Sequence, residues 1–446
     1  MDSTTGMVAS LWKRLSPVTR SAALALGFGS ALLAVLLLVV QGTDSSAKAS
    51  FKWLAGSGWK DSWEPVRLAL AYFADHRTQG LYEATYFHSS PQFLYSPVSL
   101  LLFEPFRWFY GLGPEFVAGL NAFSWWVVLG IAALTGLTFV KSIMLFRASS
   151  QPVGTPDDWF DRWVQFAVAF ATTLLFYPIV KGYALGQAQT WISVLFTGAL
   201  CAWLFGARAL SGVLVGLICT IKPQLALLVV WAATRREWRF VGAQFAIIVL
   251  LGLLSVWLYG FDNHVDFARL LLFLSGRGES YFASHSVNSL MNRLLFNGSN
   301  LQWDPTHTRI AYNPIVHAVS TATSLVLIGF ALFWRVPGGG RARIIDFCIA
   351  ALSFTMASPI AYEHHYGVLL PIFAVILPAM AGDPHTRRGE WVALVVAFVL
   401  SANYFSITKQ LADTYLNVLQ SYLLFAGVIM LVLMYRTNLA KPDPAG

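Results

Sequence analysis

The run Tyr362-Glu363-His364-His365-Tyr366 places a carboxylate and two imidazoles side by side at the start of an apolar segment. Ionisable residues at the depth of a membrane are energetically expensive, so they indicate function when they occur there. Adjacent histidines on a helix point about 100° apart. They therefore chelate a metal less well than histidines four positions apart. We predict contact with a substrate or phosphate; helix capping by the histidines and a structural metal are the alternatives.

Two carboxylates, Asp61 and Glu64, stand at the start of an amphipathic stretch in which Trp63, Val66 and Leu70 recur at helical spacing. Residues three apart share one face of a helix. The positive end of the helix dipole favours carboxylates here, so Asp61 can serve as a helix cap. The other interpretation is that one of the two carboxylates is a general base held against the membrane surface.

Five further polar side chains are candidates for substrate binding. Lys222 precedes a proline within an apolar run. Its side chain either extends to the membrane interface or pairs its ammonium group with a phosphate. The other four candidates come from distant parts of the chain: Tyr95, Gln187, Asn288 and Arg293.

The composition excludes a soluble protein. Apolar residues make up 57% of the 446 residues and charged residues only 12%, about half the charged share of a soluble chain. The net charge is +8, but the cations stand between apolar runs. That pattern is typical of cytoplasmic turns, so we expect no nucleic-acid partner. The three cysteines lie in apolar runs and are expected to be buried and inert.

A membrane-spanning helix needs about 20 mostly apolar residues. On this basis the sequence predicts an all-α polytopic membrane protein with about 10–12 membrane helices and extracytoplasmic juxtamembrane helices. One integral-membrane domain, 1–446, is expected, with a cytoplasmic N-terminus, 1–20, before a retained first helix at 21–40. Further spans are predicted at 116–140, 163–180, 187–206, 240–260, 313–334, 344–360, 366–382, 391–405 and 417–435.

Two regions, 92–110 and 209–233, admit two topologies. If each crosses the membrane once, cations such as Lys141 and Arg208 fall outside, against the positive-inside rule. We predict instead that 92–110 is re-entrant or superficial and that 209–233 is a hairpin, broken at its proline, with Lys222 at the outer tip. Such a hairpin is too short for two full crossings and must be buried in protein. Two outer segments result: the first outer segment, 42–115, and the second outer segment, 261–312.

A series of short motifs runs along the chain in this order: Asp61 or Glu64, Gly80-Leu81-Tyr82, Phe93-Leu94-Tyr95-Ser96-Pro97, Gly186-Gln187, Lys222-Pro223 and Ser358-Pro359 with His364-His365-Tyr366. This ordered set resembles the membrane glycosyltransferases of the GT-C architecture, and most closely glycosyltransferase family 87. That family includes polyprenol-phosphate-mannose-dependent α-mannosyltransferases of phosphatidylinositol mannoside synthesis. Two positions depart from its pattern. Ser96 stands where the family has the first proline of a Pro-Pro step. At the acidic position, the distance along the chain to Leu81-Tyr82 favours Glu64, whereas the residue type that the family has there favours Asp61.

The resemblance implies an inverting transferase that moves a hexose, with mannose as the first expectation, from a polyprenyl monophosphate sugar to a lipid or glycan hydroxyl. The site is expected on the extracytoplasmic side of a bacterial-type plasma membrane. No cofactor is expected; some enzymes of this architecture use a divalent ion, but no Asp-x-Asp carboxylate pair indicates one here. The expected roles are a general base for Asp61 or Glu64, leaving-group stabilisation for His364, His365, Lys222 and Arg293, sugar contacts for Gln187, Asn288 and Glu363, and a groove wall for Tyr95.

Three other functions remain as alternatives at this point. A transporter or lipid flippase would place ionisable residues near the membrane midplane and would repeat discontinuous helices in two halves. A polymerase or ligase of lipid-linked glycans would share an outer active site but would use a diphosphate-linked oligosaccharide as donor. A membrane scaffold would need no chemistry at all.

Overall fold

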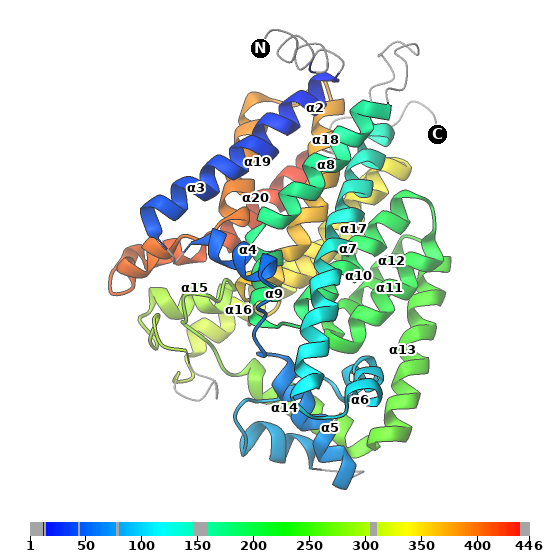
Figure 1. The fold of residues 1–446 in the computed structure, drawn as a ribbon, viewed down its shortest axis with the longest axis vertical. Coiled ribbons are helices and arrows are strands. Elements are labelled where there is room, and N and C mark those ends of the chain that lie inside the picture. The colour runs from blue at the N-terminus through cyan, green and yellow to red at the C-terminus, as the bar shows by residue number, and fades with distance from the viewer. Residues whose placement is uncertain are drawn as a thin grey trace.

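The computed structural model describes residues 12, 15–42, 45–76, 80–146, 159–303 and 310–437. Throughout these residues the regular secondary structure is helical, apart from one isolated antiparallel bridge between Ser284 and Tyr362 (Figure 1). The all-α polytopic fold predicted from the sequence is therefore confirmed. Most of the predicted cytoplasmic N-terminus, 1–20, lies outside the described residues.

Within the described part of the chain, six helices are long and apolar enough to cross a membrane. A seventh span results if α8 (Trp159–Leu175) and α9 (Tyr177–Leu185), which meet at a bend of 50°, count as one. The total is below the expected number of about 10–12, because several predicted spans form helices shorter than 18 residues, such as α10 (Gln189–Leu204), α17 (Gly340–Met356) and α19 (Arg388–Ala402). The six long helices are Thr19–Gln41, α7 (Pro114–Phe146), α13 (Trp238–Tyr259), α16 (Pro314–Phe333), Glu363–Gly382 and Tyr415–Thr437.

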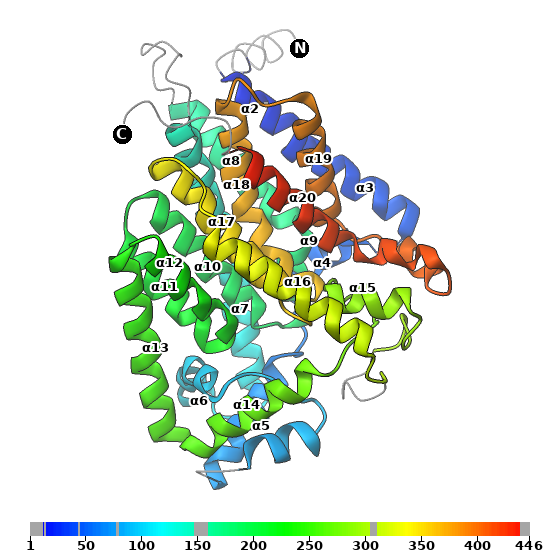
Figure 2. The same cartoon turned by 180° about the vertical axis from the view of Figure 1, so that it is seen from behind.

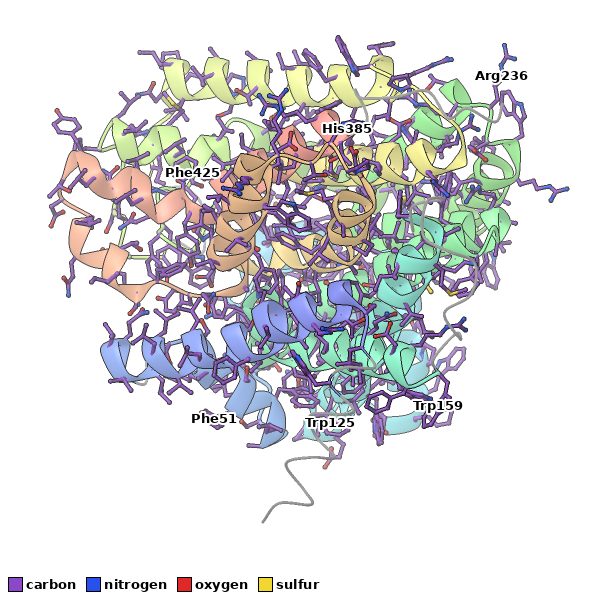
Figure 3. All side chains as sticks on the ribbon, turned by 90° about the horizontal axis from the view of Figure 1, so that it is seen from above. Phe51, Trp125, Trp159, Arg236, His385 and Phe425 are labelled. Atoms are coloured by element: carbon purple, nitrogen blue, oxygen red, sulfur yellow. The ribbon has the colours of Figure 1, made fainter. Side chains whose placement is uncertain are left out.

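The first membrane helix joins α2 (Pro17–Ala22), a π-helical stretch η1 (Ala23–Phe28) and α3 (Gly29–Gln41). It runs along one edge of the bundle beside α19, as Figures 1 and 2 show from opposite sides. Figure 3 gives the view from the end that carries Arg236 and His385. Few of the side chains of this helix are buried, so most of its surface is available to lipid.

The region 209–233 forms the predicted two-arm hairpin. Its arms are α11 (Arg208–Ile221) and, after the short 3-10 helix η4 (Pro223–Ala226), α12 (Leu227–Thr234). The arms return to one end of the bundle, because Arg208 and Glu237 form an ion pair of 3.5 Å. Lys222 lies at the turn, where proline ends α11.

The region 92–110 does not cross the bundle. An irregular loop is followed by the 3-10 helix η3 (Pro97–Leu102) and the short helix α6 (Glu104–Tyr110). Trp108 and Phe109 of α6 are exposed to 75% and 83%, which suits an interface position rather than a protein core. The prediction of a re-entrant or superficial element is confirmed.

The amphipathic stretch is the helix α5 (Trp63–Asp75), and its predicted apolar face is buried at Trp63, Val66, Leu70 and Phe73. The Trp63 indole donates a hydrogen bond of 2.9 Å to the side chain of Asn121 on α7. The first outer segment is thereby fixed to the long helix of the bundle.

The second outer segment contains α14 (Phe261–Ser275) and α15 (Val287–Leu294). Its backbone pairs with the chain just before Glu363–Gly382 at a short seam, defined here as 283–285 against 361–363. The His285 N–H donates to the Ala361 carbonyl at 2.7 Å and the Glu363 N–H donates to the Ala283 carbonyl at 3.1 Å. The seam brings two distant parts of the sequence to one place.

The opposite end of the bundle, called here the arginine end, is organised by Arg208, Arg235 and Arg343. Arg235 is buried and binds Asp346 of α17 at 2.8 Å, while it also donates to the carbonyls of Ala331, Leu332 and Trp334. α12, α16 and α17 pack together here (Figure 2). The buried pair therefore joins the hairpin to the helices that follow.

Candidate functional site

Asp61 is held in place by backbone pairing between two segments that are far apart in the sequence. The Trp59 and Asp61 N–H groups donate to the carbonyls of Ala184 and Leu185 at 3.1 and 3.0 Å. Gly186 adopts a left-handed φ of 69°, and a Cβ there would overlap the Trp59 carbonyl. Only glycine allows this approach, which explains the first residue of the Gly186-Gln187 motif.

Gln187 connects Asp61 to the tyrosine predicted from the aromatic motif. Its amide Nε2 donates to Asp61 Oδ2 at 2.5 Å, and its Oε1 accepts from the Ser62 hydroxyl at 2.9 Å. The Ser62 hydroxyl also bonds the Tyr95 hydroxyl at 2.6 Å. The structure thus brings together three predicted site residues, Asp61, Tyr95 and Gln187. Sequence reasoning missed Ser62, which no spacing signal distinguishes.

The two candidate carboxylates have different surroundings. Glu64 forms an ion pair of 2.6 Å with Arg67, and the hydrogen bond from that guanidinium lowers the pKa of Glu64. The Asp61 side chain is exposed, yet desolvation by the protein around it raises its pKa, against the hydrogen bond from Gln187 and the charge of Lys181. Ser62, not Asp61, is the N-cap residue of α5. Asp61 is therefore the accessible carboxylate suited to accept a proton.

The second wall of the site is the 3-10 helix η5 (Glu363–Val368), which begins the span Glu363–Gly382. The rings of His364 and His365 meet at right angles with their centroids 4.7 Å apart, and Tyr362 stacks on His364 at 5.8 Å. No protein atom in the described part of the chain hydrogen-bonds the buried Nδ1 of His365. That nitrogen is left available to a ligand.

Lys222, at the tip of the hairpin, lies near this wall and acts electrostatically on both His364 and His365. Ser96, which stands where the family pattern has proline, donates to the Thr220 carbonyl of α11 at 2.5 Å. The loop that carries Tyr95 is therefore fixed to the helix that presents Lys222.

Lys181 connects the two walls, although sequence reasoning missed it. It lies on α9, and its ammonium group is 3.8 Å from Glu363 Oε2. One helical turn further on, Leu185 accepts the backbone hydrogen bond from Asp61. Lys181 also acts electrostatically on Asp61. The available signal was a lysine inside an otherwise apolar membrane segment.

Glu363 is buried, and its carboxylate contacts protein side chains within this wall. Its Oε2 accepts a hydrogen bond of 2.9 Å from the Tyr177 hydroxyl in addition to the Lys181 contact. Sequence reasoning also missed Glu279, a buried residue of the second outer segment whose carboxylate acts electrostatically on the Tyr362 hydroxyl. Both carboxylates stiffen the surroundings of the histidines.

Arg293 and Asn288 do not join this cluster. Arg293 is fully buried and donates to the carbonyls of Ser280, Tyr281 and Ser284 and to the Ser421 hydroxyl. Asn288 Oδ1 accepts from Asn292 and from the Glu279 N–H. Both side chains hold the second outer segment together, and their contact with substrate stays a prediction.

The structure also bears on the metal alternative. Among the described residues, no group of three or more His, Cys, Asp or Glu side chains is arranged to hold a metal ion. The polar groups that interact electrostatically here are the Asp61 carboxylate, two lysines and two imidazoles. That set suits an anionic ligand with a hydroxyl beside it.

Fold and site together define a polytopic membrane protein with an accessible carboxylate opposite a cationic and imidazole cluster. The chain matches glycosyltransferase family 87 over residues 93–359 and belongs to that family, as the motifs predicted. It is therefore a membrane glycosyltransferase. It is also similar to the polyprenol-phosphate-mannose-dependent alpha-(1-2)-phosphatidylinositol pentamannoside mannosyltransferase of Mycolicibacterium smegmatis, with 24% identity over 331 residues, 71% of this chain and 70% of that protein. No solved structure matches the chain.

Proposed function

We propose that this glycosyltransferase moves a hexose, mannose in the first instance, from a polyprenyl monophosphate sugar to a hydroxyl of a lipid or glycan acceptor. The observation that supports this proposal is Asp61, an exposed carboxylate of raised pKa, which Lys181 links electrostatically to the wall that carries His364 and His365. The donor class follows the printed name of the mycobacterial relative.

In the proposed reaction, Asp61 accepts the proton of the acceptor hydroxyl as its oxygen attacks the anomeric carbon. The bond between that carbon and the phosphate oxygen breaks, and its electron pair passes to the phosphate. Base and phosphate-binding groups come from different walls, so attack and departure take place on opposite faces of the sugar. One displacement of this kind inverts the configuration.

The leaving phosphate gains negative charge, and the proposed groups that stabilise it are Lys222, His364 and His365. Preorganised donors and cations are most effective where charge develops in the transition state. Because these groups supply that stabilisation, we propose that transfer needs no resident metal. Gln187 positions Asp61 by a direct hydrogen bond, and Tyr95 supports Gln187 through Ser62.

The proposed orientation places this site on the extracytoplasmic side. Arg208, Arg235 and Arg343 gather at the arginine end, while Lys222 lies at the other end of the hairpin. Cytoplasmic turns of membrane proteins are rich in arginine and lysine, so the arginine end is assigned to the cytoplasm. The whole chain is proposed to act as one domain, with both outer segments at the site.

The test is transfer by the full-length protein in vesicles, with polyprenyl phosphate mannose, polyprenyl phosphate glucose and a set of lipid and glycan acceptors. We expect Asp61→Asn to lower the rate by about 10²–10⁴-fold, whereas the matched variant Glu64→Gln stays within a few-fold of wild type. Transfer should persist in a chelator. Wild-type protein that uses no monophosphate donor, or an Asp61→Asn variant of normal rate, would contradict the proposal.

A further inference from the structure

An apolar groove lies between the first membrane helix and the helices α18 (Leu369–Gly382) and α19. The first membrane helix contributes residues between 21 and 33, α18 residues between 373 and 381, and α19 residues between 391 and 399. The groove has a volume of about 530 Å³, within the range of about 300–1,000 Å³ that is usual for ligand sites. None of its lining residues is charged.

The position of the groove restricts its occupant to hydrocarbon. Two of its walls belong to segments apolar enough to cross a membrane, Thr19–Gln41 and Glu363–Gly382. A polar ligand there would lose its hydration without gaining partners. A lipid chain from the bilayer, by contrast, exchanges its apolar contacts with other lipid chains for apolar contacts with the groove.

The first membrane helix has two features along the groove, small side chains and a π-helical stretch. Ala22, Ala25 and Gly29 line the groove, although small residues in membrane helices ordinarily let two backbones approach closely. The helix is also π-helical over Ala23–Phe28, along this same wall. π-helical turns are rare and frequently mark functional sites.

One end of the groove lies close to the catalytic region. α18, which contributes to the groove from Phe373 onward, is the direct continuation of η5, which carries His364 and His365. At the same end of α19, the groove residue Asn403 is followed by Tyr404, whose ring stacks on Tyr177 at 5.2 Å. Tyr177 in turn donates its hydroxyl to Glu363. Asn403, at this end of the groove, is therefore linked to the proposed phosphate-binding wall through two side-chain contacts.

We infer that this groove holds the first part of the polyprenyl chain of the sugar donor, the part nearest the phosphate; this inference rests on the proposed function. A single groove with no cation along it fits a lipid that has one chain and whose phosphate lies beyond the groove, at His364 and His365. An acceptor lipid with two acyl chains would instead enter from the side of Asp61.

The first experiment compares two glycines of one helix. Gly29 lines the groove, and a Cβ there would meet only the Leu24 carbonyl, at 3.3 Å; Gly27 does not line it, and a Cβ there meets nothing within 4 Å. In Gly29→Leu we expect KM for a decaprenyl donor to rise at least about tenfold, the cost of losing about two buried methylenes. KM for a geranyl donor should not change, and Gly27→Leu should behave like wild type with both donors. An unchanged KM for the decaprenyl donor in Gly29→Leu would overturn the inference.

A second experiment needs no sugar transfer, so it separates this inference from the proposed function. Decaprenyl phosphate with a photoreactive diazirine at its third isoprene unit from the phosphate is irradiated with the full-length protein in vesicles. Wild type and Gly27→Leu should be labelled on α18 or α19, and Gly29→Leu should not. Equal labelling in Gly29→Leu would overturn the inference, and equal labelling of the groove by a diazirine phospholipid would show that ordinary membrane lipid fills the groove. Failure of transfer from every donor by wild type would instead refute the proposed function alone.

Discussion

The ammonium group of Lys181 lies 3.8 Å from the Glu363 carboxylate, on the helix whose next turn binds the backbone of Asp61. One short helix, α9, thus sets the spacing between the proposed base and the proposed phosphate-binding wall. The cation is partly buried, with 29% of its side chain exposed. Its charge is therefore screened less by water than that of a surface lysine.

Lys181→Met should move the pH dependence of transfer. Lys181 lowers the pKa of Asp61, so its removal raises that pKa further. A base works only when ionised, so the acid limb of the rate profile should shift to higher pH. The measurement is kcat/KM against pH, in which Lys181→Arg should restore the wild-type limb. Lys141→Met, which changes a lysine near Phe205 at the C-terminal end of α10, is the control; an unmoved limb in Lys181→Met would exclude the electrostatic role.

Gly186→Ala should reduce transfer by about 10²-fold, the effect of misplacing a reacting group by about an ångström. The added Cβ meets the Trp59 carbonyl and pushes the segment that carries Asp61 away from Gln187. Gly206→Ala is the matched control, because Gly206 has a φ of 80° but open space around it. Both variants bear the strain of a left-handed residue, about 1–3 kcal/mol. Equal rates in the two variants would contradict the close-approach argument.

Arg293→Gln should destabilise the second outer segment rather than weaken substrate binding. The guanidinium satisfies three buried carbonyls and the Ser421 hydroxyl, and leaving them unpaired costs about 3 kcal/mol. Thermal unfolding in detergent measures this loss, with Arg269→Gln as control, since Arg269 is 75% exposed in its ion pair with Asp266. A selective rise of KM for the donor at unchanged stability would restore Arg293 as a substrate contact.

Arg235→Gln should unfold the arginine end without altering the chemistry. Asp346 would be left buried and unpaired, which costs about 3–5 kcal/mol. Arg343→Gln removes a half-exposed partner of Glu237 and should cost about 0–1 kcal/mol. Denaturation midpoints measure both losses. The kcat of the folded fraction should equal that of wild type, and a reduced kcat would place the arginine end in the catalytic cycle.

Local patterns predicted the elements well. A proline beside Lys222 and the placement of cations predicted the hairpin, and apolar spacing predicted α5. The pairing of Glu64 with Arg67 was also readable, because residues three apart meet on a helix. This ion pair engages Glu64, whereas Asp61 precedes α5.

Long-range contacts could not be predicted in the same way. The carbonyl partners of Arg293 could not be predicted, because they depend on the path of a loop, which no periodicity records. Lys181 was overlooked because its importance comes from Glu363 and Asp61, which only the folded chain brings near. Residue type indicated where chemistry is possible, and tertiary packing decided which residue is free to perform it.

The seam between 283–285 and 361–363 makes the second outer segment and the histidine wall a single mechanical unit. Two backbone hydrogen bonds join them, and the Tyr366 hydroxyl adds a third to the His285 carbonyl at 2.7 Å. Separating these groups without replacement would cost about 1 kcal/mol for each bond. Any displacement of the segment that admits a substrate therefore carries His364 and His365 with it. Entry of a substrate past the second outer segment is accordingly coupled to the distance between the histidine wall and Asp61.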